Sequence, residues 1–203
     1  MASAASKQTR WISYVAVALW MGTVSLGMHL LWRYKATPGV AAAAPAAWPA
    51  ASRLTRAKHG LTLLMFAHPR CSCTRASLAE LGQLLAGQRG RLQAKVLFAL
   101  PEGADESWLR SDTVQRARRL EDVEVRMDDA GFEARQFGSA TSGQVLLYDA
   151  AGRLLFSGGV TGSRGHEGDN LGRARVASLI RGVLPDRQGS PVFGCALEKG
   201  RQR

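Results

Sequence analysis

The sequence has only three cysteines among its 203 residues, too few for a domain held together by several disulfides. It has no acidic residue before Glu80, and aromatic residues make up only 7% of the chain. It also lacks a GxxxxGK[ST] phosphate-binding loop and a GxSxG nucleophile elbow, so no motif favours a P-loop site or a Ser-His-Asp hydrolase. The hydrophobic share of 46% is nevertheless enough for a folded core, which excludes a largely disordered chain.

The formal charge of +11 is concentrated at the two ends of the chain. Residues 1–60 carry seven basic side chains and no acid, and residues 187–203 carry four basic side chains and one acid. Residues 61–186 carry 16 basic and 15 acidic side chains, so the expected folded domain is nearly neutral. Because a nucleic-acid-binding domain gathers positive charge on its folded surface, we expect no nucleic-acid partner.

A long uncharged segment follows the N-terminus. The 22 residues from Trp11 to Trp32 contain no charged side chain and are enough to cross a bilayer as a helix. Aromatic residues near both ends and basic residues on both flanks suit the two membrane interfaces. We therefore expect a single transmembrane helix at 11–32, with residues 1–10 on the cytoplasmic side. The competing interpretation is a cleavable signal peptide, whose apolar region is normally shorter, about 7–15 residues.

Residues 33–60 are rich in alanine and proline, and they predict a linker because Pro38, Pro45 and Pro49 interrupt any helix. This linker would hold the next domain clear of the membrane. From residue 61 to residue 186, strand patterns alternate with helix patterns and end in a hairpin. The predicted strands are 61–67, 93–100, 123–127, 144–149 and 153–159, and the predicted helices are 74–86, 105–120, 129–138 and 171–183. This order predicts an α/β fold, a mixed β-sheet flanked by helices.

Two of the predicted helices have recognisable starts. The helix at 105–120 begins with Asp105 as its cap and directs Trp108, Leu109 and Leu120 toward the core. The helix at 171–183 takes its cap from Asp169 or Asn170. For His166, in the glycine-rich loop before that cap, a loop position is favoured over a functional role. Residues 187–203 are expected to form a basic C-terminal tail that carries Cys195.

Two of the three cysteines, Cys71 and Cys73, lie where the first strand ends and the first helix of the domain begins. Backbone N–H groups and the helix dipole stabilise an anion at such a place. Arg70, Arg75 and His68 add positive charge nearby, which should lower a thiol pKa and raise the thiolate fraction. The pair therefore points to redox or metal chemistry rather than to two small buried apolar side chains.

Four stretches of the sequence resemble the thioredoxin-like superfamily, and within it the membrane-anchored RedB-type proteins. They are HPRCSCTRASLAEL (68–81), TSGQVLLYDAAGRLLFSGG (141–159), GHEGDN (165–170) and PVFGC (191–195). The resemblance covers about residues 61–195 and implies a central sheet flanked by helices and dithiol–disulfide exchange. It also implies that Thr141, Ser142 and Gly143 form the loop that faces the dithiol and its substrate.

The sequence departs from the thioredoxin pattern in two places. Only Ser72 separates Cys71 from Cys73, where two residues are usual, and no proline precedes the strand that begins at Gln144. A disulfide needs Cα atoms within about 4.4–6.8 Å, so residues two apart reach it only in a bent loop. A strained disulfide of this kind is more easily reduced and acts as a stronger oxidant. Alternatively, the two do not pair with each other, and Cys195 is the resolving thiol.

Three functions remain open at this point. The first is a membrane-tethered thiol–disulfide oxidoreductase without a cofactor, in which Cys71 attacks and Cys73 or Cys195 resolves. The second is a metal-binding protein, since Cys71, Cys73 and His68 form a soft ligand set for Cu(I) or Zn. The third is a non-catalytic interaction domain with unreactive thiols. For the first, the partners are the membrane and protein or small-molecule thiols and disulfides. The domain would face the periplasmic side of an inner membrane.

Overall fold

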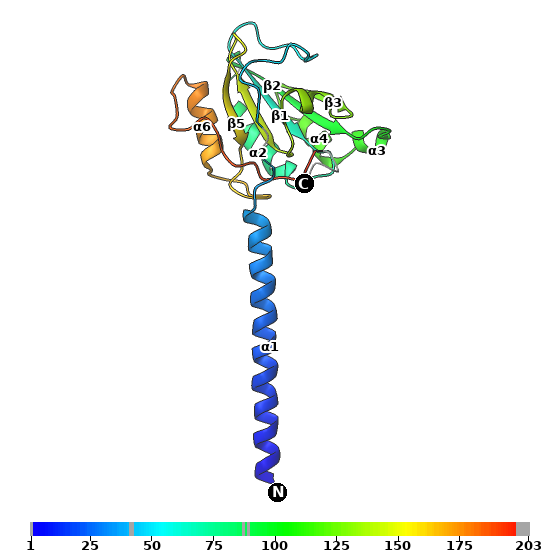
Figure 1. The fold of residues 1–203 in the computed structure, drawn as a ribbon, viewed down its shortest axis with the longest axis vertical. Helices are drawn as coiled ribbons and strands as arrows, with labels where there is room; N and C mark the ends of the chain where they lie inside the picture. Colours follow the sequence, from blue (N-terminus) through cyan, green and yellow to red (C-terminus); the bar gives the residue numbers. More distant parts are fainter. Residues whose placement is uncertain (1, 41–42, 87, 89, 198–203) are drawn as a thin grey trace. The chain divides into compact units, whose positions relative to one another are not determined.

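A computed structural model describes residues 2–40, 43–86, 88 and 90–197, in two units, Met1–Thr37 and Pro38–Arg203. The first unit is the helix α1 (Ala2–Ala36), labelled with the other elements in Figure 1. Within the described residues, one helical stretch, Arg10–Ala36, is long and apolar enough to cross a membrane. A membrane anchor and a signal sequence both have this length and composition. The helix continues four residues past Trp32, so residues 33–36 are helical and not part of a linker.

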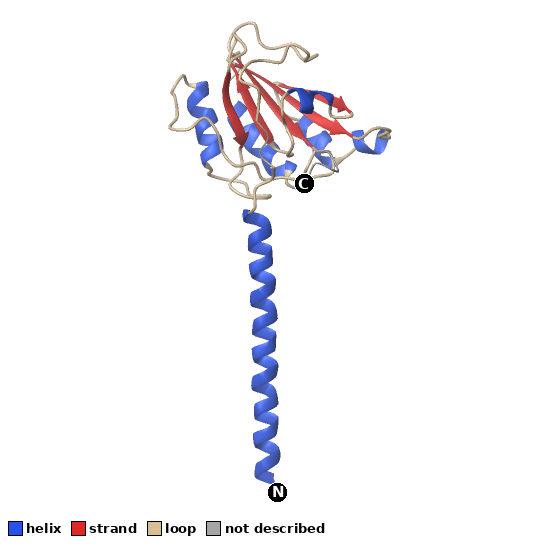
Figure 2. Ribbon diagram, in the orientation of Figure 1, coloured by secondary structure: helices blue, strands red, loops and turns tan. Residues whose placement is uncertain are grey.

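The second unit is built on a mixed sheet of five strands within the described residues, drawn in red in Figure 2. The strand order is β3-β2-β1-β4-β5, in which β1–β2 and β2–β3 are parallel and β1–β4 and β4–β5 are antiparallel. The strands are β1 (Leu61–Ala67), β2 (Leu92–Leu100), β3 (Val123–Asp129), β4 (Gln144–Tyr148) and β5 (Leu154–Gly159). The strands β1 and β2 are buried along nearly their whole length, which explains their continuous apolar sequences.

Helices and loops cover both faces of this sheet. The helices are α2 (Thr74–Leu85), α3 (Glu106–Leu109), α4 (Asp112–Arg118), α5 (Phe132–Gln136) and α6 (Leu171–Ile180). The domain has two hydrophobic cores, and alternate side chains of β1 belong to one or the other. Leu63 and Met65 pack with α2, α4 and α6, and Leu64 and Phe66 pack with α5. The predicted α/β fold class is confirmed: a mixed sheet flanked by helices and preceded by an N-terminal apolar helix.

The single helix predicted at 105–120 is wrong, because this stretch forms two short helices, α3 and α4. The chain leaves the helical conformation at Ser111, which is extended (φ −59°, ψ 149°) and whose hydroxyl accepts a hydrogen bond from the N–H of Val114 as a new cap. The predicted cap at Asp105 is present and accepts from the N–H of Ser107 at 2.9 Å. None of the α3 side chains is buried, so Trp108 does not enter the core.

The segment expected to be a spacer packs against the domain. The Trp48 ring lies edge-on to Phe137 and Tyr148, with ring centroids 4.9 Å and 5.2 Å apart. The Tyr148 hydroxyl donates to the carbonyl of Pro45 at 3.0 Å, and the side chain of Leu54 is buried. Aromatic pairs of this geometry add to the stability that burial provides. Alanine and proline content therefore indicated an irregular backbone correctly, but it did not reveal that the backbone lies on the sheet.

This packing predicts that Trp48→Ala destabilises the folded protein. Removing a large buried aromatic side chain costs about 3–5 kcal/mol, and because Trp48 is half-buried we expect about 2 kcal/mol. Denaturant unfolding of the full-length protein measures the loss of free energy. The control is Leu184→Ala, whose side chain is 76% exposed and which should change stability by less than about 0.5 kcal/mol. If Trp48→Ala lowered the free energy of unfolding no more than Leu184→Ala does, the packing of residues 43–58 would not stabilise the domain.

Candidate thiol site

The turn between β1 and α2 brings two of the cysteines to the N-terminus of α2. The N–H of Cys71 donates to the carbonyl of His68 at 3.1 Å, and the carbonyl of Cys71 accepts from the N–H of Thr74 at 3.1 Å. Cys73 is the residue that caps α2, although its side chain makes no capping hydrogen bond. This position at the end of a strand and the start of a helix is the one predicted from the sequence, and it favours an anion.

The third cysteine lies against the first. The Sγ atoms of Cys71 and Cys195 are 3.0 Å apart, although 124 residues separate them in the sequence. Cys71 is 1% exposed, and Cys195 is half-buried. All three cysteines are free thiols, so this contact is a hydrogen bond between sulfur atoms. Both of the resolving thiols that the sequence left open interact with Cys71: Cys195 lies 3.0 Å from its sulfur, and Cys73 makes a side-chain hydrogen bond with it.

The contact with Cys195 changes the acidity of Cys71. When Cys71 is ionised, the thiol of Cys195 donates to it, and this hydrogen bond is the largest effect and lowers the pKa of Cys71 to about 4. Burial opposes this by raising the pKa, whereas the backbone N–H groups of Cys195 and Cys73 and the hydroxyl of Thr74 lower it further. The lowered pKa favours the thiolate form of Cys71, and thiolates are the nucleophiles in disulfide chemistry.

The other two sulfur atoms keep their protons. The pKa of Cys195 is raised first by its hydrogen bond to Cys71, then by burial and by the negative charge of Cys71. The pKa of Cys73 is raised first by burial and then by the same charge. Three neighbouring thiols thus share one negative charge, because a second thiolate would be repelled by the first. The site combines one nucleophile with two protonated thiols.

The cations predicted to tune the cysteines make their principal contacts elsewhere. Arg70 donates to the hydroxyl of Ser107 at 2.8 Å, and its guanidinium lies 3.9 Å from the centre of the Trp108 ring. Arg75 forms an ion pair with Asp112 at 2.9 Å. The main causes of the low pKa of Cys71 are instead hydrogen bonds from neighbouring groups.

His68 and Arg164 complete the surroundings of the thiols. The Nδ1 atom of His68 accepts from the N–H of Arg70 at 3.2 Å, and the His68 ring lies edge-on to Trp108. The guanidinium of Arg164 donates to the carbonyl of Gly194, and its charge lowers the pKa of both Cys73 and Cys195. Sequence reasoning missed Arg164, because it lies in a glycine-rich loop about 90 residues after the cysteines.

The loop expected to face a substrate is covered by the chain itself. Thr141, Ser142 and Gly143 are all buried. The N–H of Ser142 donates to the carbonyl of Cys195 at 2.8 Å, and Thr141 forms an antiparallel bridge with Ala196. The loop therefore lies beside the thiols and is covered by the C-terminal segment, and its role in facing a substrate stays a prediction.

The predicted basic tail is in large part an ordered piece of the domain. The side chains of Val192, Phe193 and Leu197 are buried, with 6–8% exposure. The N–H of Ser157 in β5 donates to the carbonyl of Gln188 at 3.1 Å. These contacts carry Cys195 across the sheet edge to the thiol loop. The basic residues of the tail beyond this segment lie outside the described residues; they are Lys199, Arg201 and Arg203.

Metal binding finds no support in this arrangement. Among the residues that the structure describes, no group of three or more His, Cys, Asp or Glu side chains is placed to hold a metal ion. The ligand set considered from the sequence, Cys71, Cys73 and His68, is therefore not assembled. The soft sulfur atoms are close to one another, but the imidazole of His68 accepts a backbone hydrogen bond and packs on Trp108.

The loop that carries His166 serves the packing of α2 on α6. His166 is exposed, and the neighbouring N–H of Gly168 donates to the buried carboxylate of Glu80 at 2.6 Å. Arg173 forms an ion pair with the same carboxylate at 2.8 Å, and Asn170 caps α6 by accepting from the N–H of Arg173. The sequence left the cap of α6 open between Asp169 and Asn170, and in the structure the cap is Asn170.

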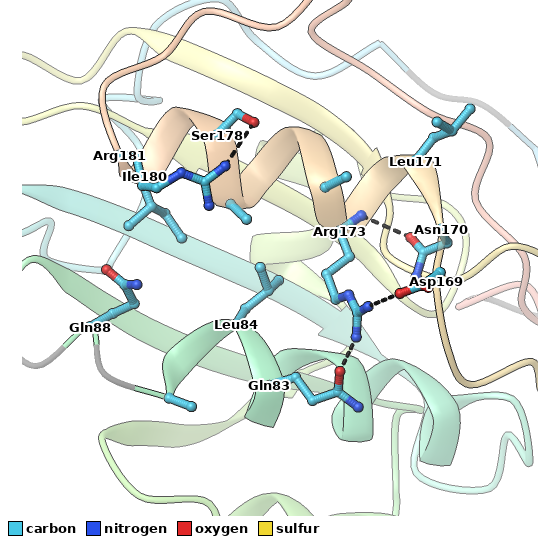
Figure 3. A pocket seen from close by; sticks show the side chains of 13 residues that line it. Gln83, Leu84, Gln88, Asp169, Asn170, Leu171, Arg173, Ser178, Ile180 and Arg181 are labelled. Atoms are coloured by element: carbon cyan, nitrogen blue, oxygen red, sulfur yellow. Dashed lines mark hydrogen bonds and ion pairs between the residues drawn. The ribbon is translucent and has the colours of Figure 1, made fainter.

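A groove of about 750 Å³ lies between α2 and α6 and does not include the cysteines. Figure 3 shows its polar end, where Arg173 lies between Gln83 and Asp169. The apolar lining comes from Leu84 and Ile180. The groove and the thiol site are therefore separate features.

Comparisons with known proteins establish the fold and no more. No family model matches the chain, and no curated protein matches it. A hypothetical protein from Sinorhizobium meliloti is 20% identical with a TM-score of 0.54 and covers 79% of this chain and 93% of its own. An uncharacterized conserved protein from Geobacillus kaustophilus is 17% identical with a TM-score of 0.56, and the match covers 83% of this chain and 95% of that protein. A secreted disulfide oxidoreductase from Mycobacterium tuberculosis is 12% identical with a TM-score of 0.41, and the match covers 61% of this chain and 82% of that protein. The first two share the fold of this chain.

Proposed function

We propose that the protein is a membrane-tethered thiol–disulfide oxidoreductase in which Cys71 is the nucleophile and Cys195 is the resolving thiol. The observation that carries this proposal is the 3.0 Å contact between the two Sγ atoms at the N-terminus of α2. A disulfide requires S–S bonding at about 2.03–2.05 Å, so a small movement joins the two sulfur atoms. The pKa of Cys71, about 4, supplies the thiolate that the reaction needs.

The reaction begins when the Cys71 thiolate attacks one sulfur of an external disulfide. The external S–S bond breaks, a mixed disulfide forms on Cys71, and one half of the substrate leaves as a thiolate that takes a proton from water. Cys195 then attacks the Cys71 sulfur, loses its proton, and expels the second half of the substrate as a thiol. The substrate disulfide has gained two electrons, and the protein holds a Cys71–Cys195 disulfide. The same steps run backward when the substrate is a dithiol.

The surroundings of Cys195 suit its later role in this sequence. Its pKa is raised mainly because it donates a hydrogen bond to the anionic Cys71 and lies in the field of that charge. In the mixed disulfide, Cys71 is no longer an anion, so both causes disappear and the pKa of Cys195 falls. The resolving thiol is thus held back while Cys71 is the nucleophile and becomes reactive once Cys71 has reacted.

We further propose that α1 anchors the protein, with residues 1–10 on the cytoplasmic side of an inner membrane and the domain on the periplasmic side. The uncharged 11–32 segment supports an anchor, and thiol exchange suits an oxidising compartment. The substrates are thiols or disulfides of proteins or small molecules. The burial of Cys71 favours a second candidate, a non-catalytic interaction domain whose thiols do not react. The experiment below separates the two.

Mass mapping of the cysteines tests the proposal. The full-length protein is treated with excess oxidised glutathione, alkylated under denaturing conditions and digested with trypsin. Cleavage after Arg70, Arg75 and Arg187 places Cys71 and Cys73 together in the peptide 71–75 and Cys195 in a separate peptide. We expect the two peptides to be joined through Cys71, with Cys73 alkylated. A Cys71–Cys73 disulfide would contradict the role of Cys195, and three unreacted thiols would favour the interaction domain.

A further inference from the structure

The nucleophile of the proposed reaction is covered by the chain's own C-terminal segment. Cys71 is 1% exposed, and residues 194–197, here called the strap, lie directly over it. Thiol–disulfide exchange requires an external sulfur to reach the attacking thiolate, so exchange depends on access as well as on pKa. With the strap in place, Cys195 fills the space beside the Cys71 sulfur through which an external disulfide would have to come.

The strap is held by backbone hydrogen bonds of the kind that join neighbouring strands. The N–H of Ser142 donates to the carbonyl of Cys195 at 2.8 Å, and the N–H of Leu197 donates to the carbonyl of Ala140 at 2.9 Å. These two bonds run in opposite directions around the antiparallel bridge between Thr141 and Ala196. Residues 140–142 therefore present the donor and acceptor pattern of a strand edge, and the strap occupies it.

We propose that the strap is a built-in occupant of this edge, and that it lifts to admit an extended segment of a partner protein that carries the reacting cysteine. This inference rests on the proposed function. The partner segment takes over the hydrogen bonds to Ala140 and Ser142 and places its own sulfur where Cys195 lies in the closed state. While the partner is still held by the mixed disulfide, its segment releases the edge and the strap returns; Cys195 then attacks the Cys71 sulfur, gives up its proton, and expels the partner's sulfur as a thiol.

The contacts of the strap make local opening feasible. Its attachments include the two backbone bonds, the hydrogen bonds between Cys195 and Cys71, the bond from Arg164 to the carbonyl of Gly194 and the burial of one side chain, Leu197. The preceding residues, Val192 and Phe193, are buried and would stay in place as the base of the movement. Segments with few buried contacts open locally at a small fraction of the cost of global unfolding.

Gly194 offers a way to lift the strap without touching a thiol. A Cβ atom added at this position would lie 1.9 Å from the carbonyl oxygen of Ser142, a contact that no side chain tolerates. The substitution Gly194→Ala therefore forces the strap away from residues 140–142. Gly162→Ala is the matched control, since the added Cβ would meet its neighbours, His166 and Asn170, at 3.6 Å and 3.7 Å, which are ordinary contact distances.

The test uses the full-length protein in detergent with Cys73→Ser and Cys195→Ser, so that Cys71 is the single thiol. We measure the rates of alkylation by two probes. The small probe is iodoacetamide, and the bulky probe is a maleimide that carries a polymer of about 5 kDa. With the strap intact, the bulky probe should react far more slowly than the small one. Gly194→Ala should raise the ratio of the bulky to the small rate by about tenfold, and Gly162→Ala should leave it unchanged.

Two outcomes overturn the inference: an unchanged ratio in a folded Gly194→Ala protein, or an equal increase in the Gly162→Ala control. Circular dichroism establishes whether each variant is folded. If Gly194→Ala does not fold, Leu197→Ala in the same background decides by the same ratio, because it removes the buried anchor of the strap. Failure of the proposed function looks different: Cys71 would then form no disulfide with Cys195 in mass mapping, whatever the accessibility ratio.

Discussion

The Cys71→Ser protein should lose thiol–disulfide exchange by roughly 100-fold or more relative to the unmodified chain. Cys71 is the one thiol of the three whose pKa is lowered, to about 4, so it alone is ionised at neutral pH. A serine hydroxyl at the same place would be a much weaker nucleophile and could not form a disulfide. Turnover of a small disulfide such as oxidised glutathione, coupled to a reductant, measures the loss.

The matched control for this result is Cys73→Ser. Cys73 caps α2 and stays protonated beside Cys71, and serine is a good helix-capping residue, so the fold should be retained. We expect exchange within about threefold of the unmodified protein if, as we propose, the resolving thiol is Cys195. A loss as large as that of Cys71→Ser would instead assign the reaction to the Cys71-Ser72-Cys73 pair first considered from the sequence.

The second large effect concerns the pH dependence of Cys71 alkylation. In the unmodified protein the pKa of Cys71, about 4, means that the reactive thiolate predominates from pH 5.5 upward, so the iodoacetamide rate should change little between pH 5.5 and pH 8. Cys195→Ala removes the hydrogen-bond donor that is the largest cause of the low pKa. The pKa of Cys71 should rise, and the ratio of the rate at pH 5.5 to that at pH 8 should fall by about tenfold or more.

A third variant makes this test specific for the hydrogen bond. Cys195→Ser keeps a donor at the same position, so its profile should lie between those of Cys195→Ala and the unmodified chain. Alkylation is read on the tryptic peptide 71–75 by tandem mass spectrometry, whose fragment ions separate Cys71 from Cys73. The ratio within each variant removes differences in access between variants. Identical profiles for all three proteins would mean that Cys195 does not stabilise the Cys71 thiolate.

Several features were predictable because they depend on neighbours in the sequence. The continuous apolar run of β1, the apolar stripe of α2 and the Asn170 cap all report on local backbone conformation, and each is present. The uncharged segment 11–32 likewise predicts its helix from length and composition alone. The prediction of a single helix at 105–120 is wrong for a local reason that is harder to see. Ser111 caps a second helix inside an otherwise helical pattern.

The make-up of the thiol site could not be predicted in the same way. The sequence placed Cys71 and Cys73 at a helix N-terminus and left their partner open between each other and Cys195. The contact between Cys195 and Cys71 is accompanied by a bridge between Thr141 and Ala196, two residues far apart in the sequence, so no local preference specifies it. The same holds for Arg164, which reaches the thiols from a loop far away in the sequence.

The sequence alone determined that this protein has an N-terminal apolar helix, a mixed α/β domain and two cysteines where the first strand meets a helix. These follow from hydrophobic periodicity and helix-start signals, which act over a few residues. Only the tertiary structure decided that Cys195 contacts Cys71, that the loop at 141–143 is covered and that residues 43–58 pack on the sheet. Contacts between residues up to 124 positions apart in the sequence depend on how the whole chain packs, and no local pattern specifies them.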